Sequence, residues 1–234
     1  MARAVDGMDC VFHLGALVAI PYSYVHPREV VETNVMGTLN VLSACKDAGV
    51  KRLVHTSTSE VYGTAQYTPI DEKHPLVGQS PYSASKIAAD QLAESFYRSY
   101  DLPVATVRPF NTYGPRQSAR AVIPAVISQA ISRDVVQVGA MHPVRDLTFV
   151  SDTVEGFLRV AVTDAAVGIV INLGSGKGIS VKDLVEKIIA LVGRKVEVLF
   201  DATRLRPEKS EVDRLEADNT RATETLGWEQ KVSF

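Results

Sequence analysis

Apolar residues in the first half of the chain alternate between short runs and longer stretches with helical spacing. Short runs rich in β-branched residues are typical of buried strands, whereas an apolar residue at every third or fourth position is typical of a helix packed on a core. The pattern predicts strands at Cys10–Ala16, Lys51–Thr58 and Leu102–Arg108, helices at about 27–48 and directly after Ser80, and loops at Ile20–Tyr24 and 64–79. This β-α-β-α-β alternation predicts an α/β fold, in which a parallel sheet carries helices on both faces.

The second half of the chain continues with shorter elements, which we expect to form a smaller C-terminal lobe. The predicted helices lie at about 121–132, 153–161, 180–192 and 219–226, and the predicted strands at 145–150, 169–172 and 196–200. A Gly-rich turn at 174–178 follows a strand, but its G-x-G-x-G spacing differs from the G-x-G-x-x-G of dinucleotide-binding turns. Ser180 is placed to cap the next helix, which explains this turn locally.

Two residues near the start of the helix after Ser80 suggest acid–base chemistry. Ser80 can cap this helix and Pro81 suits its first position, so Tyr82 and Lys86 stand four residues apart on one helix face. An ordinary tyrosine has a pKa near ~10, and a fixed neighbouring cation should lower that pKa. The pair is therefore a candidate general base directed at a hydroxyl, although the same spacing also occurs on the surface of ordinary helices.

A second motif, Thr58-Ser59-Glu60, directly follows the predicted strand at 51–58. Hydroxyls and a carboxylate at the carboxyl end of a buried strand are typical of a ligand site in an α/β sheet. Together with Tyr82-x-x-x-Lys86 and the stretch RPFNTYGP at 108–115, this motif makes the chain resemble the extended short-chain dehydrogenase/reductase family, whose members are NAD-dependent epimerases and dehydratases of nucleotide sugars. The resemblance runs from about Asp9 to Trp228.

The resemblance implies a Rossmann-like, doubly wound parallel sheet with a smaller C-terminal substrate-binding lobe. Residues 1–115 would form the remainder of the NAD-binding domain, with elements that return at about 140–172, and residues 116–234 would mainly form the nucleotide-sugar lobe. In the family, a Gly-rich turn in the first β-α-β-α-β segment holds the dinucleotide pyrophosphate. No such segment precedes the strand at 10–16, so we expect an N-terminally truncated chain that binds NAD more weakly and exposes an unpaired strand edge favouring association.

The resemblance also implies a role for each motif residue. Tyr82 would take the proton of the sugar 4-hydroxyl while hydride leaves C4, with Thr58 holding the same oxygen and Lys86 assisting. Glu60, beside Ser59, would be the base for the C5 proton. The cofactor would be NAD, contacted by Leu14, Gly15, Ala16, Asn34, Thr56, Ser57, Tyr82, Lys86 and Pro109. The nucleotide-diphosphate sugar would be contacted by Asn111, Arg116, Arg145 and Arg206.

Ser59 leaves more than one reaction open. Many 4,6-dehydratases have an aspartic acid there that protonates the departing 6-hydroxyl, whereas a serine could act only through a relay or a water. Thr-Ser-Glu is also similar to the triad of UDP-glucuronate decarboxylases, which protonate no leaving hydroxyl. The stretches 16–24, 78–86 and 204–212 resemble 4,6-dehydratases of nucleotide-linked N-acetylglucosamine in the legionaminic-acid pathway, the activity we favour. Decarboxylation, C4 epimerisation, and a non-catalytic chain that binds sugar nucleotide or only dimerises are the alternatives.

Composition excludes several other classes of protein. The 234 residues carry a net charge of −2, which leaves no basic footprint for nucleic acid. No apolar run approaches the ~18 residues of a membrane-spanning helix. Cys10 and Cys45 are expected to be reduced, and the 5 histidines lack metal-ligand spacing. We therefore expect a cytoplasmic protein without a metal, and the resemblance implies a homodimer.

Overall fold

The computed structural model describes all residues from 1 to 234. Its helices are α1 (Ala2–Val5), α2 (Ile20–Val25), α3 (Pro27–Val31), α4 (Gly37–Ala48), α5 (Pro81–Tyr100), α6 (Val122–Ser132), α7 (Val150–Val162), α8 (Val181–Val192) and α9 (Thr220–Leu226). Its strands are β1 (Cys10–His13), β2 (Arg52–Thr56), β3 (Val104–Pro109), β4 (Asn111–Tyr113), β5 (Val135–Val138), β6 (Val144–Phe149), β7 (Val170–Leu173), β8 (Gly178–Ser180), β9 (Glu197–Phe200) and β10 (Arg214–Leu215). A π-helical turn, η1 (Glu32–Met36), joins α3 to α4, and the 3₁₀ turns are η2 (Ser59–Tyr62), η3 (Asp164–Ala166), η4 (Ala202–Arg204) and η5 (Glu208–Ser210).

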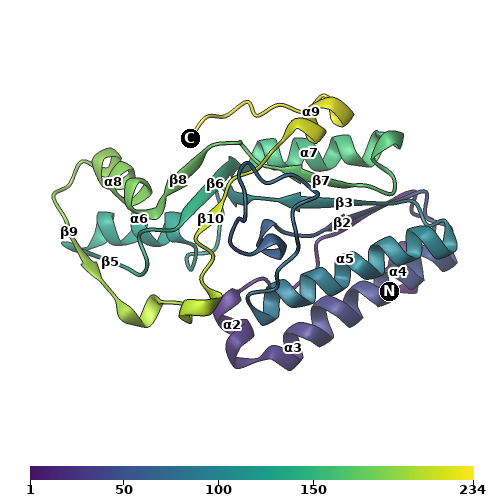
Figure 1. The fold of residues 1–234 in the computed structure, drawn as a ribbon, viewed down its shortest axis with the longest axis horizontal. Helices are drawn as coiled ribbons and strands as arrows, with labels where there is room; N and C mark the ends of the chain where they lie inside the picture. The colour runs from purple at the N-terminus through teal and green to yellow at the C-terminus, as the bar shows by residue number, and fades with distance from the viewer.

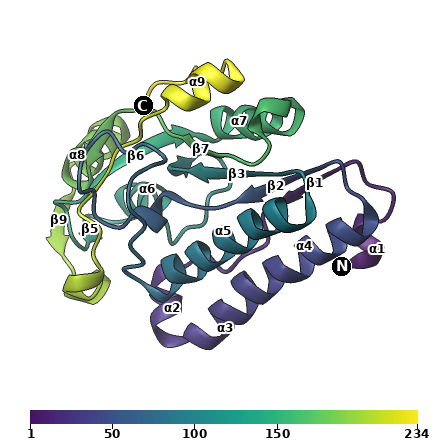
Figure 2. The same ribbon diagram turned by 45° about the vertical axis from the view of Figure 1, so that its right-hand side comes forward.

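The main sheet has four parallel strands in the order β1-β2-β3-β7. Helices α3, α4 and α5 cover one face of this sheet, and α7 and α9 cover the other (Figures 1 and 2). Leu42, Leu53 and their neighbours fill the first interface, while Ile171, Trp228 and their neighbours fill the second. This doubly wound arrangement confirms the predicted α/β, Rossmann-like fold class. Strand β1 lies at one edge and pairs only with β2.

The remaining strands form two smaller sheets. Strand β6 pairs in parallel with β4 and β10 and antiparallel with β8, while β5 pairs in parallel with β9. Helices α6 and α8 pack together beside these strands, on the left in Figure 1. Helix α9 instead packs against β7 and α7, so the chain returns to the main sheet near its C-terminus. The expected division at residue 115 stays a prediction.

Three elements near the start of the chain differ from those that the sequence predicts. The predicted loop Ile20–Tyr24 is helix α2, whose first turn contains Pro21, at a position where a missing N–H breaks no helical hydrogen bond. The helix predicted at 27–48 is divided by η1, and β1 ends at His13 rather than at Ala16. Asn34 in η1 binds the backbone of the segment that follows β1: the Leu17 N–H donates to Asn34 Oδ1 at 2.8 Å, and Asn34 Nδ2 donates to the Leu17 carbonyl at 3.0 Å.

The Gly-rich turn at 174–178 binds an internal carboxylate. Asp146 in β6 accepts hydrogen bonds from the backbone N–H groups of Ser175 at 2.7 Å, Gly176 at 2.8 Å and Ala217 at 3.1 Å. These N–H groups are therefore engaged within the protein, and Ser180 Oγ accepts a hydrogen bond from the Asp183 N–H at 3.0 Å, which is the helix cap that the sequence predicts. No helix combines the length and the apolar composition needed to cross a membrane.

Candidate active site

Helix α5 begins with a cap that orients the predicted base. The Ser80 side chain accepts a hydrogen bond from the Ser83 N–H at 3.1 Å, and Ser83 Oγ accepts one from the Ser80 N–H at 2.9 Å. With Pro81 in the first turn, the helix turns Tyr82 and Lys86 toward the sheet, where both are buried. Lys86 Nζ donates to a carbonyl at the end of β2, that of Thr56, at 2.6 Å. The ammonium is therefore fixed at the carboxyl edge of the sheet.

The motif Thr58-Ser59-Glu60 follows the end of β2 and forms the start of the tight turn η2. Thr58 Oγ1 accepts a hydrogen bond from the Glu60 N–H at 3.2 Å and so caps the turn. Ser59 and Glu60 are both buried. Gly63 ends the turn with a φ of 65°, and a Cβ there would collide with Gln79 and Val77. The glycine thus lets the segment before α5 approach the turn that carries Glu60.

The charge environment of Tyr82 differs from the one predicted. Burial raises the pKa of Tyr82 to about 12, and the hydrogen bond with the Thr58 side chain only partly offsets this. The negative charges of Glu60 and Asp90 raise the pKa further. The expectation that Lys86 lowers the pKa of Tyr82 is therefore wrong for this structure. Burial also lowers the pKa of Lys86, against the opposing effect of Asp90.

Asn34 lies at the centre of the predicted cofactor side. Besides its two hydrogen bonds to Leu17, Asn34 Nδ2 donates to Ser85 Oγ at 2.9 Å. Ser85 precedes Lys86 on α5, so one buried amide joins the segment after β1 to the catalytic helix. Single π-helical turns such as η1 are frequent at functional sites.

The other residues predicted to contact NAD are distributed along the same edge. Leu14–Ala16 line a hollow of about 600 Å³ beside β1. Thr56 has a buried hydroxyl without a hydrogen-bond partner, and Pro109 ends β3. Ser57 Oγ donates to Asp90 at 2.7 Å, so its side chain supports the site from within. The hollow is lined mainly by apolar residues of α1 and β1, whereas the unpaired hydroxyl of Thr56 and the carbonyl that binds Lys86 lie at the end of β2.

The structure brings together two of the four predicted substrate residues. Arg206 Nη1 lies 3.6 Å from Glu60 Oε2, and Arg145 Nη2 lies 3.4 Å from Glu211 Oε1. Burial lowers the pKa of Arg145 and Arg206 lowers it further, while Glu60 and Glu211 raise it. Asn111 is half-buried with a buried Oδ1 that has no hydrogen-bond partner. Arg116 is exposed and forms no ion pair.

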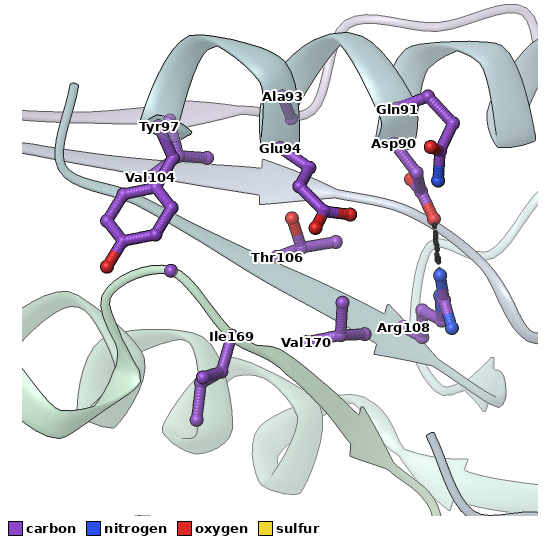
Figure 3. Close-up of a pocket in the computed structure, with 11 residues that line it drawn as sticks. Asp90, Gln91, Ala93, Glu94, Tyr97, Val104, Thr106, Arg108, Ile169 and Val170 are labelled. Carbon is purple, nitrogen blue, oxygen red and sulfur yellow. Dashed lines mark hydrogen bonds and ion pairs between the residues drawn. The ribbon is translucent and has the colours of Figure 1, made fainter. Parts of the chain in front are cut away.

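Sequence reasoning missed a buried charge beneath the site. Asp90 accepts hydrogen bonds from Arg108 Nη2 at 3.0 Å and from His55 Nε2 at 3.1 Å, and the Asp90–Arg108 pair is drawn in Figure 3. Both residues also line a cavity of about 100 Å³ between α5 and the edge strand β7 (Figure 3). Arg108 Nη1 donates to Tyr62 Oη at 3.0 Å. The available signal was spacing, because Asp90 follows Lys86 by four residues on the same helix face.

Comparison with known proteins agrees with this geometry. A sequence model described as GDP-mannose 4,6 dehydratase matches residues 3–234. The chain is 35% identical over 231 residues to UDP-glucose 4-epimerase of Mycolicibacterium smegmatis, covering 97% of this chain and 72% of that protein. DesIV, the dTDP-glucose 4,6-dehydratase of Streptomyces venezuelae solved with NAD bound, superposes with a TM-score of 0.91 at 30% identity, covering 100% of this chain and 71% of DesIV. TunA, an NAD-dependent NDP-hexosamine 5,6-dehydratase, gives a TM-score of 0.91 at 30% identity, covering 100% and 75%.

The parallel sheet, with Thr58 to Glu60 and the Tyr82–Lys86 pair at its carboxyl edge, defines an enzyme of the class that epimerises or dehydrates nucleotide sugars. The chain belongs to the GDP-mannose 4,6-dehydratase family. This confirms the resemblance to the short-chain dehydrogenases/reductases. The predicted cofactor is confirmed at the level of the family, since DesIV carries bound NAD.

Proposed function

We propose that this protein is an NAD-dependent 4,6-dehydratase of a nucleotide-linked N-acetylhexosamine. The observation that carries the proposal is the position of Glu60, which is buried in the turn capped by Thr58 and lies 3.6 Å from Arg206. Oxidation at C4 needs only one base, and simple epimerisation would leave this buried carboxylate without a task. A second base near the first is what removal of the C5 proton requires.

The residues of the chain divide the reaction among them. Tyr82, in its phenolate form, takes the proton of the sugar 4-hydroxyl, and Thr58 holds the same oxygen. NAD, when bound beside Asn34 and Lys86, would supply the hydride acceptor for C4 and the hydride donor for C6, and the return to C6 is completed by a proton at C5. The C4 ketone acidifies the C5–H, whose proton passes to Glu60. The C6–O bond then breaks, and the hydroxyl leaves as water with a proton that Ser59 can supply only through a relay or a water.

The nucleotide diphosphate is proposed to bind on the side of the second sheet. Arg145 and Arg206 would pair with the phosphates, and Asn111, with its unpartnered oxygen, would meet the ligand nearby. Arg116 would join them only if its exposed side chain turned toward the site. Support for a hexosamine comes from the stretches 16–24, 78–86 and 204–212 and from the similarity to TunA.

The decarboxylase alternative is favoured by one observation, the buried Ser59 in place of a carboxylic acid. Loss of carbon dioxide from a 4-keto uronate needs no acid for a leaving hydroxyl, so a serine would suffice there.

Product analysis separates these functions. The protein is supplied with NAD in D₂O and given UDP-N-acetylglucosamine or UDP-glucuronate, and the products are followed by proton NMR. The 4,6-dehydratase is expected to produce a 6-deoxy-4-keto sugar with a C6 methyl group and deuterium at C5. A product that keeps a C5–C6 double bond would identify a 5,6-dehydratase instead. Pentose formation from the glucuronate, without reaction of the amino sugar, would reject our proposal.

We also propose that the protein works as a cytoplasmic homodimer. Both cysteines are free thiols, which suits a reducing compartment. Exposed apolar side chains on the helical layer of α3, η1 and α4, such as Val31 and Met36, are available for association. Sedimentation velocity on the purified protein tests the dimer, and a monomer at tens of micromolar would reject it.

A further inference from the structure

Four charged side chains of opposite sign meet between the main sheet and the C-terminal lobe. Arg206 Nη1 lies 3.6 Å from Glu60 Oε2 and 3.8 Å from Glu211 Oε1. Arg145 Nη2 lies 3.4 Å from the same Glu211 oxygen. All four side chains are at least three-quarters buried, so solvent screens these charges only in part. Glu211 is the member to which the proposed reaction assigns no role.

Arg206 is shared between two carboxylates and fully paired with neither. Its Nη1 is buried and has no hydrogen-bond partner, because both carboxylate oxygens lie beyond hydrogen-bond distance. A buried donor left without a partner is costly, so Arg206 would move closer to one carboxylate if the other lost its charge. The position of Arg206 therefore depends on the balance between Glu60 and Glu211.

Glu211 is held in place by a hydrogen bond within its own segment and by hydrogen bonds from this segment to Gln79 and Thr64. Its Oε1 accepts a hydrogen bond from the Val212 N–H at 3.1 Å, and its backbone carbonyl accepts one from Gln79 Nε2 at 2.9 Å. Thr64 Oγ1 accepts a hydrogen bond from the Asp213 N–H at 3.1 Å. Thr64 follows the turn that carries Glu60, and Gln79 precedes helix α5. These contacts fix Glu211 relative to both proposed bases.

We propose that Glu211 is a positioning residue that draws Arg206 away from Glu60, which keeps Glu60 able to accept a proton and limits the affinity for the nucleotide diphosphate. The inference rests on the proposed function, since it assigns the C5 proton to Glu60. Glu211 itself touches no reacting atom. It acts through Arg206, whose charge both the carboxylate of Glu60 and an incoming diphosphate attract.

The variant Glu211→Gln tests this balance because two measured quantities should move in opposite directions. Two arginines then face only Glu60, so the local charge becomes more positive and a diphosphate binds more tightly. At the same time Arg206 pairs with Glu60 alone, which stabilises the carboxylate and makes it a poorer proton acceptor. Gln keeps an oxygen for the Val212 N–H, so the fold is expected to persist. A merely structural role would weaken binding and turnover together.

The first measurement is calorimetric titration with UDP, which needs neither NAD nor turnover. The matched control is Glu208→Gln, which removes the same charge three residues away, from an exposed side chain with no ion pair. We expect Glu211→Gln to bind UDP roughly three- to tenfold more tightly than the wild type, and Glu208→Gln to match the wild type within twofold. Unchanged or weaker binding by Glu211→Gln would overturn the proposal, as would a wild type that binds none of UDP, dTDP and GDP.

The second measurement is turnover of UDP-N-acetylglucosamine as a function of pH. We expect kcat of Glu211→Gln to fall about three- to tenfold while KM also falls, and the acid limb of the kcat profile to move to lower pH. In an Arg206→Gln background the same change should alter kcat less than twofold, because the residue through which Glu211 acts is gone. An equal effect in both backgrounds would overturn the proposal. If the wild type turns over no sugar nucleotide but the UDP contrast holds, the proposed function fails while the sharing of Arg206 stands.

Discussion

Replacing Asp90 by Asn removes a buried negative charge from the floor of the candidate active site and leaves the shape of the side chain nearly unchanged. The Asp90 side chain is 3% exposed and accepts hydrogen bonds from Arg108 Nε at 3.2 Å and Nη2 at 3.0 Å, from Ser57 Oγ at 2.7 Å and from His55 Nε2 at 3.1 Å. Burial alone would raise its pKa, but the hydrogen bond from His55 and the charge of Arg108 outweigh burial and lower it. Asp90 is therefore ionised in the folded protein at neutral pH.

The expected loss of stability follows from the buried charge of Arg108, which loses its counter-charge in the Asp90→Asn variant. The Arg108 side chain is 5% exposed, so without Asp90 a guanidinium stays buried without a counter-charge. Breaking a buried ion pair by removing one partner costs about 3–5 kcal/mol. Because Asn still offers an oxygen to Ser57 or Arg108, we expect a loss near the lower end, about 3 kcal/mol. In a domain of this size that lowers Tm by roughly 6–12 °C.

Urea unfolding followed by far-ultraviolet circular dichroism at pH 7 measures this loss. The control is Glu94→Gln, one helical turn further along α5, which breaks an exposed pair with Arg98. That pair lies largely in solvent, so the control should lose no more than about 0.5 kcal/mol. If Asp90→Asn lost less than about 1 kcal/mol, or no more than the control, the conclusion that Asp90 is the counter-charge of buried Arg108 would be refuted.

Three further predictions concern the site and its pH response. Tyr82→Phe should slow hydride transfer by ~10²–10⁴-fold with UDP-sugar affinity kept within threefold, and turnover near the wild-type rate would remove Tyr82 from the mechanism. Glu60→Gln should stall after oxidation, seen as an NADH absorbance that forms in a single turnover and persists, whereas normal release of product would exclude Glu60 as the C5 base. Burial, with His55 and Lys86, lowers the pKa of His13 to about 4. As pH falls below 6.5, the His13 imidazole of the unfolded chain is therefore protonated before that of the folded chain. Stability should therefore drop by on the order of 2 kcal/mol between pH 6.5 and 4; His13→Gln should flatten this drop and exposed His26→Gln should not.

The main sheet could be predicted because its strands are marked locally. Each buried strand is a short apolar run, and each covering helix repeats its apolar positions along one face. The contact of Asn34 in η1 with Leu17 after β1 could not be predicted, since it joins residues 17 positions apart in the sequence. Strands of two or three residues, such as β8 and β10, are too short to show any periodicity.

Some features of the candidate site could likewise be predicted from the sequence, and others could not. Tyr82 and Lys86 could be paired from the sequence because a helix fixes residues four apart on one face, and the position of Glu60 follows from the end of a strand. The direction of the Tyr82 pKa could not be predicted, because it depends on burial and on the charges of Glu60 in η2 and Asp90 in α5. Glu211 lies in one of the stretches that carry the resemblance, 204–212, but the sequence did not indicate its contacts. Its contact with Arg145 joins residues 66 positions apart. Arg145 lies in β6, and Glu211 directly follows the short turn η5.

Two arginines show how the site combines a rigid floor with a side open to ligand. Arg108 donates to Asp90 and to Tyr62 at 3.0–3.2 Å, so its charge-assisted hydrogen bonds are complete. The Nη1 donor of Arg206 is equally hidden from solvent but has no acceptor within hydrogen-bond distance. An anion that reaches Arg206 thus gains a hydrogen bond without first breaking one, whereas displacing Arg108 would sacrifice several. Proton and hydride transfer demand fixed distances between reacting atoms, and the fully paired Asp90 stands one helical turn after Lys86 on the same helix as Tyr82.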